Sequence, residues 1–207
     1  EFQLLEWYRT GCDYTQLMAD CQGLVRFLHE RLSEHTFSCG DKNGPDSFFG
    51  IDVSAEWQRL TVADAFTRYS PVPLQRALDS GSFDEILTEH VEPNLGSKSP
   101  LFLYAYPCEL ASLARRSPGN PGIAERFELY IKGVELANGF SELTDEHEQR
   151  SRFHDEIAAI NANSGQNEDM PERFLRDLGK IEEAAGIVLG VDRLFMLKKK
   201  KKSITSA

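Results

Sequence analysis

The chain has 207 residues, of which 41% are hydrophobic and 27% charged, and its formal net charge is −10. This length predicts a single domain with a sizeable core, and no apolar run reaches the length of a membrane span. The charge is uneven, because residues 1–197 carry 18 Lys and Arg against 33 Asp and Glu, whereas residues 198–202 are five Lys. An acidic body repels phosphate backbones, so this part of the chain is a poor generic nucleic-acid binder.

The chain opens on a predicted strand. Phe2, Glu6 and Tyr8 share strand parity, so we expect their side chains to face one side. Taken alone, this pattern also fits a strand with one charged, exposed position. A helix is predicted to begin at Asp13, because apolar residues then recur every three to four positions. These residues are Leu17, Met18, Cys21, Leu24, Val25 and Leu28.

The middle of the chain predicts a loop, a helical segment and a strand. Residues 36–50 are rich in Gly, Ser, Asp and Asn and predict a loop. Residues 61–91 predict a small helical insertion, with helix starts at Thr61 and Ser82. Residues 101–106 predict a strand that ends at Pro107. The four cysteines show neither CxxC nor Cys/His spacing, which indicates reduced thiols and a cytoplasmic location.

Residues 126–140 predict a β-hairpin with a tight turn at Lys132 and Gly133. In its first strand Phe127, Leu129 and Ile131 alternate with Glu128 and Tyr130, which predicts a half-buried strand.

Two acids flank this turn, and the sequence leaves two interpretations of them open. Glu128 and Glu135 are expected to lie opposite each other, and facing carboxylates repel unless a cation lies between them. Mg2+ suits such a pair, because it takes one or two protein carboxylates and fills its shell with phosphate oxygens. The alternative is a hairpin whose acids lie in water.

The last third predicts two helices, a strand and a final helix. Thr144 is the expected N-cap of the first helix, with Phe153, Ile157 and Ile160 on its buried face. Residues 161–170 predict a polar linker, and Pro171 suits the first turn of the second helix. Residues 187–189 predict a short buried strand that turns into the final helix at Gly190. The basic segment 198–207 is expected to be disordered.

Three of these segments resemble class II aminoacyl-tRNA synthetases of the lysine branch. Residues 1–8 resemble the second half of motif 2, residues 126–142 the sheet segment that comes after it, and residues 186–197 motif 3. Two forms, Glu-Trp-Tyr at residues 6–8 and Glu-Leu-Ala-Asn-Gly-Phe at residues 135–140, are most similar to the short paralogues that attach β-lysine to elongation factor P.

The resemblance implies an α/β fold, with a mostly antiparallel sheet flanked by helices. It implies a catalytic domain over residues 1–197 that is incomplete at both ends, with 61–91 as an insertion. The parent family is homodimeric, and the dimer motif has no counterpart here. The motif 2 Arg that grips the α-phosphate in this family also has no counterpart in the sequence, and we therefore expect this chain alone to be inactive.

The resemblance also implies roles for individual residues. It places ATP on Phe2, Glu128, Leu129, Gly190 and Arg193, and Mg2+ on Glu128 and Glu135. Arg193 would be catalytic, binding the γ-phosphate. The lysine-like substrate would lie against Glu6, Tyr8, Glu135, Asn138 and Glu142. Lysyl-tRNA synthetases carry Gly at the positions of Ala137 and Val188.

The implied reaction is ATP-dependent activation of a lysine-type amino acid through an aminoacyl-adenylate. Three hypotheses remain for the acceptor of the activated amino acid. The first is transfer of lysine or β-lysine to a lysine of elongation factor P. The second is transfer to tRNA-Lys by a lysine–tRNA ligase. The third is a non-catalytic remnant that only binds a ligand or partner.

Overall fold

The computed structural model describes residues 2–36, 51–164 and 168–198. The predicted loop 36–50 and basic tail 198–207 therefore lie almost wholly outside the described residues. Within the described part, one sheet runs in the order β1-β7-β6-β5-β3-β2, with β4 paired to β5. The strands are β1 (Leu4–Thr10), β2 (Gln58–Thr61), β3 (Leu101–Pro107), β4 (Arg116–Ser117), β5 (Asn120–Ile131), β6 (Val134–Ser141) and β7 (Ala184–Gly190).

All pairs in this sheet are antiparallel except β2 with β3. Helices flank it, which confirms the predicted α/β fold. None of the helices described here combines the length and apolar composition needed to cross a membrane. The α-helices are α1 (Tyr14–Thr36), α2 (Val62–Tyr69), α3 (Leu74–Asp79), α4 (Phe83–Ile86), α5 (Glu146–Ser164), α6 (Glu172–Leu178) and α7 (Val191–Lys198). Short turns of helix are η3 (Leu87–Val91), η4 (Glu92–Asn94) and η5 (Cys108–Leu110).

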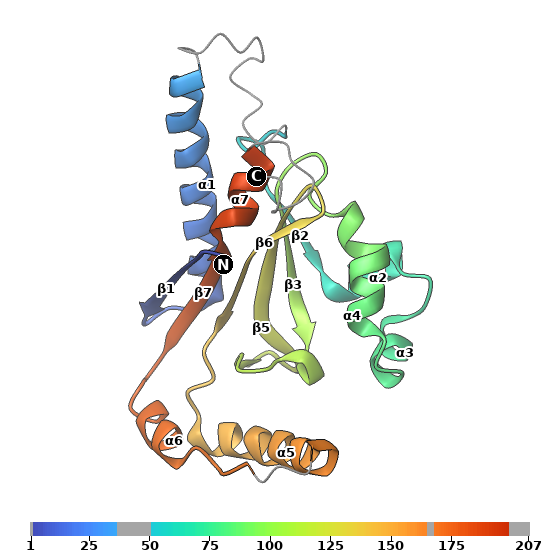
Figure 1. The fold of residues 1–207 in the computed structure, drawn as a ribbon, viewed down its shortest axis with the longest axis vertical. Helices are drawn as coiled ribbons and strands as arrows, with labels where there is room; N and C mark the ends of the chain where they lie inside the picture. Colours follow the sequence, from blue (N-terminus) through green and yellow to red (C-terminus); the bar gives the residue numbers. More distant parts are fainter. Residues whose placement is uncertain (1, 37–50, 165–167, 199–207) are drawn as a thin grey trace.

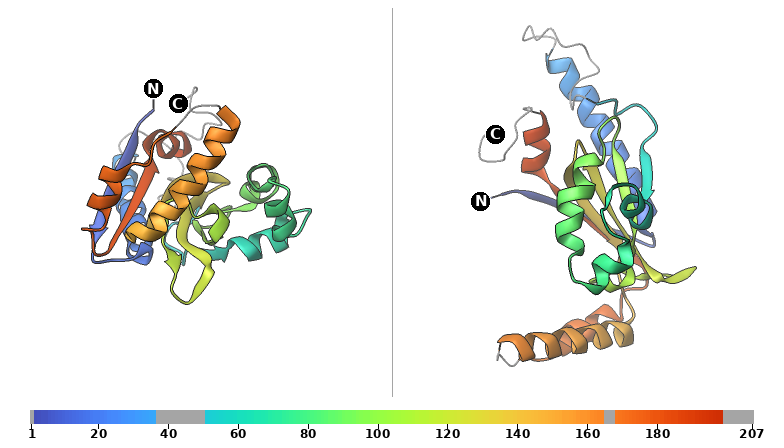
Figure 2. Two further views of the ribbon diagram at one scale, coloured as in Figure 1. Left: turned by 90° about the horizontal axis from the view of Figure 1, so that it is seen from below. Right: turned by 90° about the vertical axis from the view of Figure 1, so that its right-hand side faces the viewer.

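The core lies on both faces of the sheet. Helix α1 covers one face, and the α2–α4 group packs at the β2–β3 end, as Figures 1 and 2 show. On β5, Phe127 and Leu129 pack with the α1 cluster, and Tyr130 packs with the α2–α4 cluster. The prediction of a half-buried strand is therefore wrong at this end of β5, because apolar clusters cover both of its faces.

The hairpin turn forms where predicted, but its register differs from the expectation. Lys132 and Gly133 both have positive φ, 53° and 72°, as the twist of a two-residue hairpin requires. The two-residue turn places Tyr130 opposite Glu135, and a register shift between Leu129 and Tyr130 then places Asn138 opposite Glu128. The two acids are therefore not direct cross-strand partners.

Helix starts were predicted with mixed success. Thr61 is the N-cap of α2, because its side chain accepts a hydrogen bond from the Asp64 backbone at 3.0 Å. At α5 the cap is Asp145 instead of Thr144, since Asp145 Oδ1 accepts from two backbone N–H groups at 2.8 and 2.9 Å. A carboxylate at this position also gains from the helix dipole.

The predicted buried face of α5 is wrong. Phe153 and Ile157 are only half-buried and Ile160 is 38% exposed. Figure 1 shows the reason, since α5 and α6 lie beyond one end of the sheet. Helix α5 continues to Ser164, so the segment 161–170 is not wholly a linker.

Candidate active site

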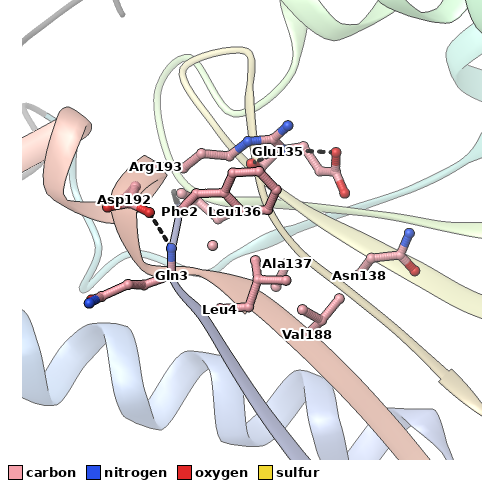
Figure 3. A pocket seen from close by; sticks show the side chains of 11 residues that line it. Phe2, Gln3, Leu4, Glu135, Leu136, Ala137, Asn138, Val188, Asp192 and Arg193 are labelled. Atoms are coloured by element: carbon pink, nitrogen blue, oxygen red, sulfur yellow. Dashed lines mark hydrogen bonds and ion pairs between the residues drawn. The ribbon is translucent and has the colours of Figure 1, made fainter. Parts of the chain in front are cut away.

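Two neighbouring cavities lie along strands β1, β7 and β6. The first, of about 360 Å³, lies between these strands and the start of α7 (Figure 3). Phe2, Gly190 and Arg193, all expected to bind ATP, line it, and we call it the nucleotide cavity. The second, of about 350 Å³, is lined by Glu6, Tyr8, Glu142 and others, and we call it the amino-acid cavity.

One row of side chains across four strands joins the two cavities. Val188 on β7 pairs with Glu6 on β1 and with Asn138 on β6, and Asn138 pairs in turn with Glu128 on β5. Residues directly opposite one another in a sheet point to the same face. Asn138 and Val188 consequently line both cavities.

The next row on this face completes the amino-acid cavity. It runs Tyr8, Gly186, Phe140 and Arg126 across the same strands. At Gly186 a Cβ atom would lie 2.5 Å from both the Glu142 carboxylate and the Tyr8 ring. Only glycine leaves room for these two side chains to lie over the strand.

Glu142 lies half-buried in this cavity, and burial raises the pKa of its carboxyl to about 7. Burial, and to a smaller extent the charges of Glu142 and Glu6, raise the pKa of the Tyr8 hydroxyl. A desolvated carboxylate is stabilised by a cation. The cavity therefore suits a ligand that carries an ammonium group.

In the nucleotide cavity the predicted phosphate ligand contacts a predicted metal ligand. Arg193 Nη1 donates to Glu135 Oε2 at 2.9 Å and to the Glu135 carbonyl at 2.8 Å (Figure 3). Burial and then the charge of Glu128 raise the pKa of Glu135, and Arg193 opposes the shift. Two carboxylates thus influence each other here, although they are not opposite in the ladder.

Glu128 is the most heavily bonded acid of the site and only 5% exposed. One oxygen accepts from Arg126 Nη2 at 2.8 Å and Asn138 Nδ2 at 3.2 Å, and the other accepts from the Tyr130 hydroxyl at 2.7 Å. The Tyr130 hydroxyl also lies 3.0 Å from Glu92 Oε1.

Sequence reasoning missed three of these groups: Arg126, Tyr130 and Glu92. Arg126 and Tyr130 flank Glu128 at a spacing of two, so strand parity alone could have placed them beside it. Glu92 is 38 residues from Tyr130, and no local pattern connects them.

The donor set suits a metal that keeps ligands from a phosphate. Within the residues described, no group of three or more His, Cys, Asp or Glu is arranged to hold a metal ion. Two carboxylates are nonetheless the usual protein contribution to a Mg2+ that binds with a nucleotide. The charge of Glu128 raises the pKa of Glu135, and a cation near both carboxylates would relieve that repulsion.

Leu129, expected to contact ATP, has a side chain that is fully buried in the α1 cluster. Its side chain therefore faces away from both cavities, and only its main chain remains for a nucleotide contact. Phe2 is 73% exposed at the rim of the nucleotide cavity.

Comparison with known proteins identifies the family of this chain. Residues 1–207 match the family described as tRNA synthetases class II (D, K and N). The chain belongs to this family. The fold described above is accordingly that of a class II synthetase catalytic domain, and the resemblance inferred from the motifs is confirmed.

Two kinds of relative are similar to this chain. An elongation factor P–(R)-β-lysine ligase of Proteus mirabilis is 37% identical over 95% of this chain and 61% of that protein. The protein of the same name from Pectobacterium atrosepticum is 36% identical over 99% of this chain and 63% of its own length. A lysine–tRNA ligase of Magnetococcus marinus is 33% identical over 95% of this chain and 42% of that protein. The chain thus spans less than two thirds of the relatives it matches.

Proposed function

We propose that this chain forms the catalytic core of an enzyme that activates a lysine-type amino acid with ATP and transfers it to a lysine of elongation factor P. One observation carries the proposal. Asn138 and Val188 line both the nucleotide cavity and the amino-acid cavity, so two ligands bound there would meet at this row. Adenylate formation requires such contact, because holding two reactants in place supplies much of the rate enhancement.

In the proposed first step, a carboxylate oxygen of the amino acid attacks the α-phosphorus of ATP. An acyl–phosphate bond forms, the bond to the β-phosphate oxygen breaks, and pyrophosphate leaves. Bound Mg2+ supplies charge neutralisation on the phosphates. Glu128 and Glu135 would hold it, Arg193 would grip the γ-phosphate with its planar fork, and Phe2, Gly190 and the Leu129 main chain would lie against adenosine.

The amino-acid cavity accounts for the lysine class. Glu6 and Glu142 offer negative charge to the two ammonium groups of the substrate, and Tyr8 and Asn138 offer hydrogen bonds. An amino acid with a neutral side chain would leave the half-buried Glu142 unpaired. Because an unpaired buried polar group is costly, the cavity should discriminate strongly against such amino acids in favour of lysine.

The proposed second step transfers the acyl group to an amine. The acceptor amine loses one proton and attacks the adenylate carbonyl carbon. The C–N bond forms, the C–O bond to AMP breaks, the nitrogen releases a second proton, and AMP leaves. The names of the relatives from Proteus and Pectobacterium support elongation factor P as acceptor.

A lysine–tRNA ligase function is the second candidate, supported by the relative from Magnetococcus. The proposal further includes a cytoplasmic location, a homodimeric assembly, and residues 1–197 as the catalytic unit with 61–91 inserted.

The full-length protein tests the proposal in two stages. Pyrophosphate exchange with ATP should depend on (R)-β-lysine or α-lysine and be absent with norleucine, which lacks the side-chain ammonium. Transfer of the radiolabelled amino acid to elongation factor P, and not to tRNA-Lys, should then occur. Pyrophosphate exchange that does not depend on lysine would contradict the proposal, and so would a lack of transfer to elongation factor P. Charging of tRNA-Lys would favour the second candidate.

A further inference from the structure

A third cavity, of about 420 Å³, lies beside the amino-acid cavity. Arg126 and Ser112 line both cavities, and Glu128 lies in the wall of the third. Phe83, Leu87 and Tyr106 supply buried apolar wall. This space therefore adjoins the place where the adenylate would form.

Three exposed acids from three separate elements surround this cavity. Asp84 belongs to α4, Glu109 to η5 and Glu156 to α5. Within the part of the chain that the structure describes, none of them forms an ion pair or a side-chain hydrogen bond. The cation in the wall, Arg126, is already paired with Glu128 at 2.8 Å. A concave surface lined by one sign of charge concentrates ligands of the opposite sign.

The wall also holds a polar group that lacks a partner. Tyr106 is 1% exposed, and its buried hydroxyl makes no hydrogen bond of good geometry among the described residues, while burial and the nearby Glu128 carboxylate raise its pKa. The guanidinium of Arg126 lies over its ring, 4.5 Å from the centroid. Buried polar groups are nearly always paired in folded proteins, so an unpaired hydroxyl in a cavity wall points to a ligand that completes it.

We propose that this cavity receives the side chain of the acceptor lysine, and we call it the acceptor cavity. The inference rests on the proposed function. The alkyl stem of a lysine matches the apolar wall, its ammonium matches the three carboxylates, and an ammonium N–H can donate to the Tyr106 oxygen. A tRNA end would instead bring phosphates toward those carboxylates. The acceptor cavity thus favours a protein acceptor over a nucleic acid.

A binding experiment tests the cavity without requiring activity. The probe is Nα-acetyl-lysine N-methylamide, measured by NMR titration with excess (R)-β-lysine present to occupy the amino-acid cavity. The matched control probe is the norleucine analogue, which keeps the alkyl stem and lacks the ammonium. We expect the lysine probe to bind at least about 10-fold tighter, with a difference that shrinks as salt screens the charges.

Three variants show where the probe binds. Changing Asp84→Asn, Glu109→Gln and Glu156→Gln together should abolish the preference for the lysine probe. A control with the same charge change at exposed acids elsewhere, Glu30→Gln, Glu89→Gln and Glu168→Gln, should keep it. Tyr106→Phe removes only the unpaired hydroxyl and should weaken the lysine probe about 2- to 10-fold. Unchanged affinity in the first triple variant would overturn the proposal.

The two half-reactions of the full-length protein give the functional test. In the first triple variant, pyrophosphate exchange should stay within about twofold of wild type, while transfer to elongation factor P should fall at least tenfold. An equal fall in both reactions, or undiminished transfer, would overturn the assignment. If the wild-type protein shows no exchange with either lysine, the proposed function fails, and the binding experiment still decides whether the cavity takes an alkyl ammonium.

Discussion

The Nη1 atom of Arg193 lies 2.9 Å from Oε2 of Glu135, so the residue proposed to bind phosphate neutralises one proposed to bind Mg2+. When MgATP binds, Arg193 would leave Glu135 and pair with the phosphate. Glu135 would then pair with Mg2+ in place of Arg193. Phosphate affinity and metal affinity should therefore be coupled at this position.

Glu135→Gln tests that coupling. In the wild-type protein, calorimetry should show tighter binding of ATP with Mg2+ than without it, and the variant should lose this difference while keeping its fold. Loss of one preorganised phosphate or metal contact should lower the activation rate about 100- to 1000-fold. Glu89→Gln, an exposed acid on η3, is the control and should change neither quantity. Retained Mg2+ dependence in Glu135→Gln would rule out the metal role.

Arg126 is predicted to position Glu128 and Asn138. Its Nη2 donates to Glu128 Oε1 at 2.8 Å, and its Nε lies 3.4 Å from Asn138 Oδ1. Arg126→Lys keeps the charge but not the fork, so we expect a loss of about 1.5–3 kcal/mol in transition-state stabilisation. KM for lysine and the Mg2+ concentration for half-maximal rate should rise together.

Arg116→Met is the control for this change, since Arg116 is half-exposed and pairs with Glu148 outside the cavities. It should leave both constants unaltered. If Arg126→Lys lowered thermal stability and left both constants unchanged, Arg126 would have only a structural role.

Val188 is predicted to influence the choice between α-lysine and β-lysine. It lies between Glu6 and Asn138 in the row shared by the two cavities, where its methyl groups occupy space beside a bound amino acid. Val188→Gly should raise activity on α-lysine relative to β-lysine about 10- to 200-fold, the usual worth of one or two methylenes in a pocket. Val188→Ala should give an intermediate ratio. Paired pyrophosphate-exchange assays check this, and an unchanged ratio in both variants would contradict it.

The raised pKa of Glu142 predicts a pH-dependent stability. Its carboxyl has an ordinary pKa of 4.5, and burial raises this to about 7 in the folded chain. Below pH 4.5 the carboxyl is neutral in both the folded and the unfolded chain. Above pH 7 it is ionised in both, and only the folded chain bears the cost of desolvating the charge. The protein should therefore lose stability as pH rises between these values.

Glu142→Gln removes this cost. In urea unfolding, the free energy of unfolding of the variant should rise relative to wild type by on the order of 1 kcal/mol between pH 5 and pH 8. This figure is reduced for the partial exposure of the group. Lysine binding by the wild-type protein should strengthen over the same range, as the carboxylate forms. A stability difference that does not change with pH would contradict the assignment.

The amino-acid sequence by itself determined the local elements and pointed to several of the side chains that line the two cavities. Thr61 caps α2 as predicted, because an N-cap hydrogen bond spans only three residues. Gly190 ends β7 and leads into α7 where the pattern placed it. Such features depend on neighbours along the chain, so a single sequence contains the information needed to predict them.

Only the tertiary structure decided which residues meet. A shift between Leu129 and Tyr130 set Asn138 opposite Glu128, where the turn alone would have set Ala137, and strand register depends on packing over the whole sheet. The Tyr130–Glu92 contact and the space that Gly186 leaves for Glu142 and Tyr8 likewise join distant segments. The partial exposure of Phe153, Ile157 and Ile160 has the same origin, since the position of α5 beyond one end of the sheet decides how much of this helix is covered.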